Sequence, residues 1–228
     1  MGRLQSWFGN GWFGIAELLL TALCVFFSLS IHEFAHGYAA YKMGDNTAKY
    51  MGRLNINPMS HLDPIGALCL FLFGFGWARP VPVNPGNFKT GKIKSGMVIT
   101  SLAGPLSNLV VAFLSLLVLR LTERFYGFQS EIAVTVYNVI VTLLVTLISM
   151  NISLAIFNLI PIPPLDGSKI LSAILPSRIY FKLMQFERYG FIILIILINL
   201  PVFSRRLYWL RNIFLIIFDG IIGILPFL

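Results

Sequence analysis

The chain has 228 residues, of which 57% are hydrophobic and only 11% are charged, and its formal net charge is +8. A soluble domain carries about 25% charged residues, so this composition excludes an ordinary soluble globular protein. Several apolar runs approach or exceed the ~20 residues that a helix needs to cross a bilayer. The sequence therefore predicts an all-α, polytopic integral membrane protein.

The basic residues lie in the connections between the apolar runs. They do not form a basic face with interleaved aromatic side chains, as a nucleic-acid-binding surface would require. The connection over residues 42–95 is rich in Lys and Arg, which predicts that it faces the cytoplasm and contacts anionic lipid. No nucleic-acid partner is expected.

The apolar runs predict about five to six membrane segments. Residues 44–64 alternate over short stretches and contain β-formers, and the apolar run at 65–77 is too short to span a bilayer. A short β or re-entrant region is therefore expected between the first two full spans. The helical segments are expected at about residues 12–41, 96–120, 132–160, 168–175, 189–202 and 208–225.

Two histidines and a glutamate lie inside the first apolar run, in the stretch HEFAH. His32 and His36 are four residues apart, so they share one helix face and both rings can reach one metal ion. Glu33 lies about 100° round the helix, within reach of a metal-bound water. H-E-x-x-H is the pattern of two zinc ligands and a general base, which takes the proton as water attacks a peptide carbonyl.

The membrane setting strengthens the metal interpretation of this motif. Each of the three ionisable groups would cost a few kcal/mol at the bilayer centre unless it is paired or bound to metal. The chain has 3 histidines, and two of them are in the motif. We therefore predict one zinc ion (Zn²⁺) per chain.

A catalytic zinc normally has three protein ligands and one open position. Asp166 lies in NLIPIPPLDG, directly after the third span, and the predicted topology puts it on the same face as the end of the first span. Asp166 is the preferred third ligand, with His61 and Asp63 as alternatives. An N-cap role for Asp166 is compatible with ligation.

Small and polar residues recur at helical spacing on the second span. This stripe predicts close helix packing, with Asn108 as a candidate supporting residue of the site. His61 is also a candidate supporting residue, and a simple loop role is its alternative. The residues of the stripe are Ser101, Gly104, Asn108, Ala112 and Ser115.

Together these motifs resemble those of the site-2 protease family of intramembrane zinc metalloproteases. That family pairs an H-E-x-x-H helix with a later Asn-x-x-Pro-x-Pro-x-x-Asp-Gly type motif, which here is NLIPIPPLDG at residues 158–167. AGPLSNL at 103–109 resembles the small-residue segment of the family. NPMSHLDPIG at 57–66 resembles a motif of its small bacterial and archaeal branch. The matches span most of residues 30–175.

The resemblance implies that His32, His36 and Asp166 bind zinc and that Glu33 is the base. It also places Asn158 near the site, where it would hold substrate backbone or the oxyanion, although interhelical hydrogen bonding is an alternative. The implied activity is hydrolysis of a peptide bond in or near a transmembrane segment, close to the cytoplasmic face of a prokaryotic cell membrane. The expected substrate is a membrane protein with a single transmembrane helix.

We expect one membrane-embedded metalloprotease domain over residues 1–228, with a catalytic core at about 12–175 and C-terminal membrane segments at about 176–228. At this length we expect no PDZ or CBS module. Two alternatives remain, a transporter or channel that uses the buried His and Glu side chains as an ion relay, and an inactive membrane scaffold. The sequence does not give the oligomeric state.

Overall fold

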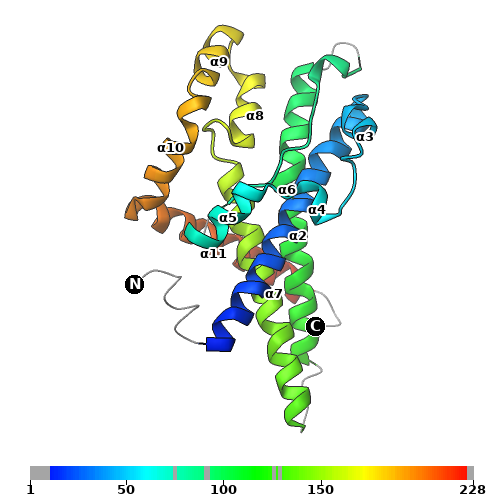
Figure 1. Cartoon of the computed structure of the whole chain (residues 1–228), viewed down its shortest axis with the longest axis vertical. Helices are drawn as coiled ribbons and strands as arrows, with labels where there is room; N and C mark the ends of the chain where they lie inside the picture. The colour runs from blue at the N-terminus through cyan, green and yellow to red at the C-terminus, as the bar shows by residue number, and fades with distance from the viewer. Residues whose placement is uncertain (1–10, 74–75, 90–92, 125–126, 128–129, 225–228) are drawn as a thin grey trace.

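The computed structural model describes residues 11–73, 76–89, 93–124, 127 and 130–224 (Figure 1). Of the described residues, 81% are helical and none lies in a β-strand. The prediction of an all-α fold is therefore confirmed.

Three long apolar helices form the body of the molecule, and Figure 1 shows them side by side. They contain 33, 32 and 28 residues, so at ~1.5 Å per residue each is long enough to cross a bilayer. α6 packs against both α2 and α7. The three helices, which correspond to the three predicted full spans, are α2 (Gly11–Met43), α6 (Ile93–Arg124) and α7 (Glu131–Asn158).

Four shorter helices follow α7. α8 packs against α6, and α11 packs against α7. α10 and α11 meet at an angle of 81°, so the pair counts as a fourth span only if it is taken as one bent element. The predicted total of five to six membrane segments stays a prediction. The four helices are α8 (Asp166–Ile174), α9 (Ser177–Met184), α10 (Glu187–Asn199) and α11 (Pro201–Gly223).

The predicted β structure between α2 and α6 is not found in the residues that the structure describes there. In the described part of this connection, the nearest feature to a strand is one isolated antiparallel bridge between Leu62 and Ala78. Local side-chain bonds favour helical turns instead, because Asn57 accepts from the amide of Met59 and Asp63 accepts from the amide of Ile65. The helices here are α3 (Thr47–Tyr50), α4 (Pro58–His61), α5 (Pro64–Phe73) and the 3₁₀ turn η1 (Pro85–Asn87).

The small and polar stripe predicted on the second span is buried along its whole length. Ala112 of this stripe belongs to an apolar core cluster together with residues of α7 and α11. α7 is also tied to α2 by a polar contact, since Asn151 Nδ2 donates to Ser28 Oγ at 2.8 Å and both side chains are fully buried. The prediction that the stripe serves close helix packing is therefore confirmed.

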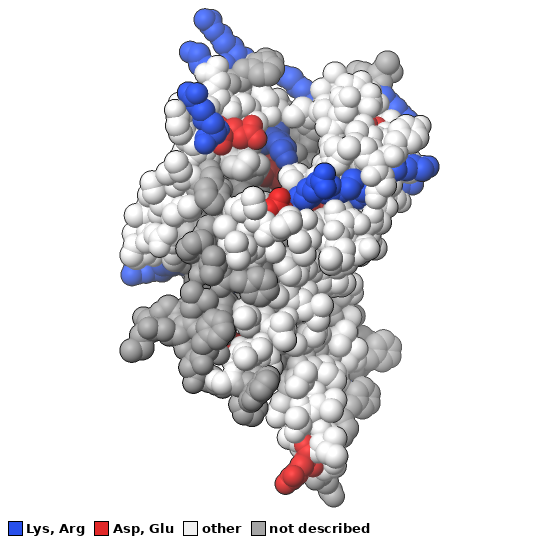
Figure 2. All heavy atoms as spheres, in the orientation of Figure 1, with Lys and Arg blue, Asp and Glu red and all other residues white. Residues whose placement is uncertain are grey.

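Charge is distributed unevenly along the molecule. Figure 2 shows most of the Lys and Arg side chains of this face over its upper half, around the ends of α2, α6 and α8. The lower half of the bundle is largely uncharged on the same face. This pattern fits a helix bundle in lipid with one basic end.

Candidate metal centre

Three predicted ligand residues meet in the upper half of the bundle. His32 and His36 lie one turn apart on α2, and Asp166 is the first residue of α8. All three are buried, and their ligand atoms form a group that can hold a metal ion. His61 and Asp63, the alternatives for the third ligand, are not in this group.

The distances within the group fit a zinc site. Asp166 Oδ2 lies 3.1 Å from His32 Nε2 and 3.0 Å from His36 Nε2, and the two Nε2 atoms are 3.0 Å apart. Zinc bonds of about 2.0–2.1 Å in a tetrahedron would place the ligand atoms about 3.3–3.4 Å apart. A widening of a few tenths of an ångström would therefore admit the ion.

A backbone carbonyl on α6 fixes the orientation of the His36 ring. His36 Nδ1 donates to the carbonyl oxygen of Thr100 at 2.6 Å. Because the carbonyl can only accept, the proton is on Nδ1, and Nε2 faces His32 and Asp166. Metal-binding histidines usually have such an outer partner.

Asp166 also contacts a cation. Its Oδ1 accepts from Lys169 Nζ at 3.2 Å, while Oδ2 faces the histidines. Burial opposes ionisation, but the imidazoles of His32 and His36 and the charge of Lys169 hold the pKa of Asp166 below its usual range. The carboxylate is therefore ionised, as a metal ligand must be.

Glu33 lies beside the ligand group, one residue after His32. Its Oε2 accepts from the backbone amide of Val81 at 2.7 Å. This contact comes from the extended segment that precedes α6, and it holds one oxygen of the carboxylate. Glu33, His32, His36 and Asp166 all line one cavity of about 850 Å³.

The three candidate supporting residues, Asn158, Asn108 and His61, lie in different surroundings. Asn158 lines the same cavity, and its Nδ2 donates within its own helix to Leu154 O. Asn108 is fully buried on the packing stripe of α6 and does not line the cavity. Asn158 therefore lines the cavity that contains the ligand group, and Asn108 does not.

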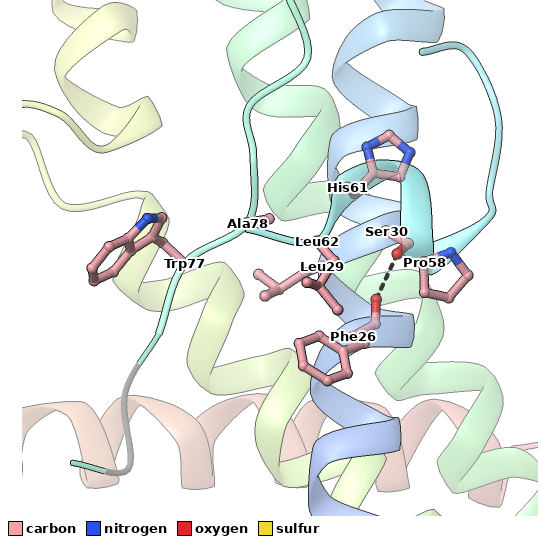
Figure 3. Close-up of a pocket in the computed structure, with 8 residues that line it drawn as sticks. All are labelled: Phe26, Leu29, Ser30, Pro58, His61, Leu62, Trp77 and Ala78. Carbon is pink, nitrogen blue, oxygen red and sulfur yellow. Dashed lines mark hydrogen bonds between the residues drawn. The ribbon is translucent and has the colours of Figure 1, made fainter. Parts of the chain in front are cut away.

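His61 lines a separate, small cavity between α2 and α4 (Figure 3). The figure shows its ring at the end of α4, with Leu62, Ala78 and residues of α2 around it. His61 Nε2 is 2.8 Å from the carbonyl oxygen of Asn55. The nearby Asp63 accepts from the amides of Ile65 and Gly66 and so caps α5. The hydrogen bonds of both residues therefore stay within the connection between α2 and α6.

Sequence reasoning missed three contacts of the site. Thr100 acts through its backbone carbonyl and Val81 through its backbone amide, so neither leaves a signal in its residue type. Lys169 was detectable, because a lysine three residues after an aspartate at a helix start shares its face.

Comparison with known proteins agrees with the site. Residues 20–199 match the model of Peptidase family M50. A Bacillus subtilis (strain 168) protein named "Putative zinc metalloprotease YwhC" is 42% identical over 185 residues, which cover 81% of this chain and 82% of that protein. No solved structure is significantly similar.

Mycobacterial proteins are also similar to the chain. The Mycolicibacterium smegmatis protein named "Putative zinc metalloprotease Rip2" is 30% identical over 196 residues, covering 80% of this chain and 69% of that protein. Its Mycobacterium tuberculosis (strain H37Rv) namesake is 28% identical over 82% of this chain and 70% of its own length. The chain therefore belongs to peptidase family M50, the site-2 protease family, and is an integral membrane protein.

Proposed function

We propose that this protein is an intramembrane zinc metalloprotease that hydrolyses a peptide bond in or near a transmembrane segment of a membrane protein. The observation that carries the proposal is the convergence of His32, His36 and Asp166 beside Glu33 in one cavity. Family membership and the names of the relatives support the same chemistry.

His32, His36 and Asp166 would hold one zinc ion. When bound, zinc would act as a Lewis acid and lower the pKa of a water molecule in the cavity towards ~7. Glu33 would take a proton from the water through the carboxylate oxygen that does not bond to Val81, and would then deliver it to the leaving amine. Asn158, which lines the cavity, would hold substrate backbone or the oxyanion.

The lining of the cavity favours an apolar substrate. Beyond the ligand group it consists mostly of apolar side chains, which come from the segment before α6 and from α7, α9 and α10, among them Val81, Phe157, Met184, Leu194 and Ile198. Such walls would contact the apolar side chains of a transmembrane segment, while the polar groups of the site would contact its peptide backbone. A single-pass membrane protein is the proposed substrate.

The active site is proposed to face the cytoplasm of a prokaryotic cell. The basic connection between α2 and α6 and the Lys and Arg side chains around α8 and α9 lie at the same end of the molecule as the ligand group (Figure 2). The positive-inside rule puts that end on the cytoplasmic side.

The test is cleavage of a single-pass model substrate in liposomes that also contain the purified protein. Wild-type protein should cut the substrate, lose activity when a chelator removes zinc, and regain it when Zn²⁺ but not Mg²⁺ is added back. Cleavage that continues in zinc-free protein would contradict the proposal. Tight zinc binding with ion transport and no cleavage would favour the transporter alternative.

A further inference from the structure

Asp45 is a buried carboxylate outside the metal centre. It lies two residues after the end of α2 and is 0% exposed. Its Oδ1 accepts from both the backbone amide and the hydroxyl of Thr47. Burying a carboxylate is costly unless hydrogen bonds satisfy it. The partners of Asp45 therefore show which part of the fold it stabilises.

Asp45 fastens the segment of residues 78–88, which ends in the turn η1 and which we call the strap. Its Oδ2 accepts from the backbone amide of Asn84 at 2.7 Å, and its Oδ1 accepts from Asn87 Nδ2 at 2.8 Å. Just beyond the strap, the amide of Lys89 donates to the carbonyl of Met43 at 2.9 Å. The second half of the strap is therefore tied to the end of α2.

The strap crosses α2 at the catalytic base. The Val81 amide donates to Glu33 Oε2, and the Val81 side chain is buried. One turn beyond Glu33, a Cβ atom at Gly37 would lie 3.0 Å from Val81 Cγ1. Since ordinary carbon contacts are about 3.5–4.0 Å, a side chain at residue 37 would press against the Val81 side chain, so the strap packs closely on α2 beside Glu33.

The first half of the strap is anchored separately. The guanidinium of Arg53 donates to the carbonyl oxygens of Arg79 at 2.7 Å and Pro80 at 3.3 Å. The Arg79 amide donates to the carbonyl of His61 at 2.8 Å. Val81 thus lies between two anchors, and Asp45 is the one that contributes a buried charge.

We propose that Asp45 is a positioning residue for Glu33, acting through the strap. The inference rests on the proposed function, because it assumes that Glu33 is the general base. Asp45 fixes Asn84 and Asn87, the strap fixes the Val81 amide, and this amide orients the carboxylate of Glu33. None of these contacts involves His32, His36 or Asp166. Loss of Asp45 should therefore slow the chemistry and leave zinc binding intact.

The test compares Asp45→Asn with Asp45→Asn/Asn87→Asp. The single change replaces one carboxylate oxygen of Asp45 by an amide N–H. That N–H would face other N–H donors, so the strap should loosen. In the double change, the side-chain amide oxygen at residue 45 can still accept from the Asn84 amide, while its N–H donates to the new carboxylate at residue 87. Both bonds to the strap are then kept, and only the bond from the Thr47 amide is lost. Asp219→Asn is the matched control, since Asp219 pairs with Arg120 between α11 and α6, away from the strap.

For Asp45→Asn we expect kcat to fall by about tenfold or more, because small displacements of a catalytic group are costly. KM and zinc affinity should stay within about twofold of wild type, and the double variant should recover to within about threefold. Thr47→Val, which removes one donor, should lower kcat by about two- to fivefold if Asp45→Asn does not fold.

Three results would overturn the inference. These are an unchanged kcat in Asp45→Asn, an equal loss in the double variant, and a fall in zinc affinity that matches the fall in kcat. Wild-type protein that binds zinc but cuts no substrate would instead refute the proposed function. The control Asp219→Asn should keep the wild-type kcat.

Discussion

Gly104 on α6 packs directly against the ring of His36 on α2. A Cβ atom at residue 104 would overlap His36 Nε2 and would lie 2.6 Å from His32 Cε1. Both atoms belong to the rings whose Nε2 atoms would bind the metal. α6 therefore supports the site both through the absence of a side chain at Gly104 and through the Thr100 carbonyl one turn earlier.

Gly104→Ala should therefore impair metal binding more than folding. The added methyl group must displace at least one imidazole, so zinc affinity should fall by about tenfold or more. Competition with a chromophoric zinc chelator measures this effect. The matched control is Gly220→Ala on α11, where a Cβ atom would meet nothing within 4 Å. Equal zinc affinity in both variants would contradict the geometry.

Asp166→Asn should weaken zinc binding because a neutral amide is a poor ligand and the charge near the two histidines is lost. We expect a loss of about tenfold or more in zinc affinity, with little change in helix content. Asp63→Asn is the comparison, since Asp63 caps α5 away from the ligand group. A wild-type zinc affinity in Asp166→Asn would remove Asp166 from the ligand set.

Asn151→Leu should lower stability without altering the metal site. The change removes the hydrogen bond from α7 to Ser28 on α2. Such contacts between membrane helices are worth about 0.6 kcal/mol on average and about 1.7 kcal/mol at most. Thermal unfolding in detergent should show the loss, and Ser153→Ala, which removes only a bond to Ser149 within α7, should not. A more stable Asn151→Leu protein would contradict the role of this contact.

The contribution of Asp45 to stability should depend on pH with a definite sign. Burial opposes its ionisation, but the bonds from Thr47, Asn84 and Asn87 hold its pKa below the ordinary value of 3.8. Because the folded-state pKa is lowered, the stabilisation is fully present above about pH 4 and is lost as the pH falls further.

The difference in melting temperature between wild type and Asp45→Asn should thus be constant from about pH 8 to about pH 5 and shrink below about pH 4. Thermal unfolding in detergent across this pH range measures it. A difference that grows as the pH falls would contradict the assignment. Asp219→Asn, at an exposed ion pair, serves as the reference for general effects of acid.

The correct predictions from the sequence came from local patterns, namely helical spacing and the length of apolar runs. Helical spacing put His32 and His36 on one face, and apolar length gave the three long helices. The third ligand required tertiary information, and only the predicted topology of α7 brought Asp166 close in advance. The β prediction for residues 44–64 failed because side-chain caps such as those of Asn57 and Asp63 stabilise helical turns there.

The contacts that complete the site have no local signature. The strap reaches Glu33 through a backbone amide, and α6 reaches His36 through a backbone carbonyl. Asp45 looked like one carboxylate among several in the sequence, and only the fold shows its partners to be Asn84 and Asn87. These contacts join residues that are more than 30 positions apart in the sequence. Helical or strand periodicity relates only near neighbours, so it cannot reveal them.

The central claim is that zinc-activated water attacks a peptide bond with Glu33 as the base. The most direct measurement is zinc content and substrate cleavage on the same preparation of Glu33→Gln protein. We predict one zinc per chain, as in wild type, and a loss of cleavage of about 10²-fold or more. Glu33→Gln protein that keeps its zinc and cuts substrate at the wild-type rate would contradict the claim.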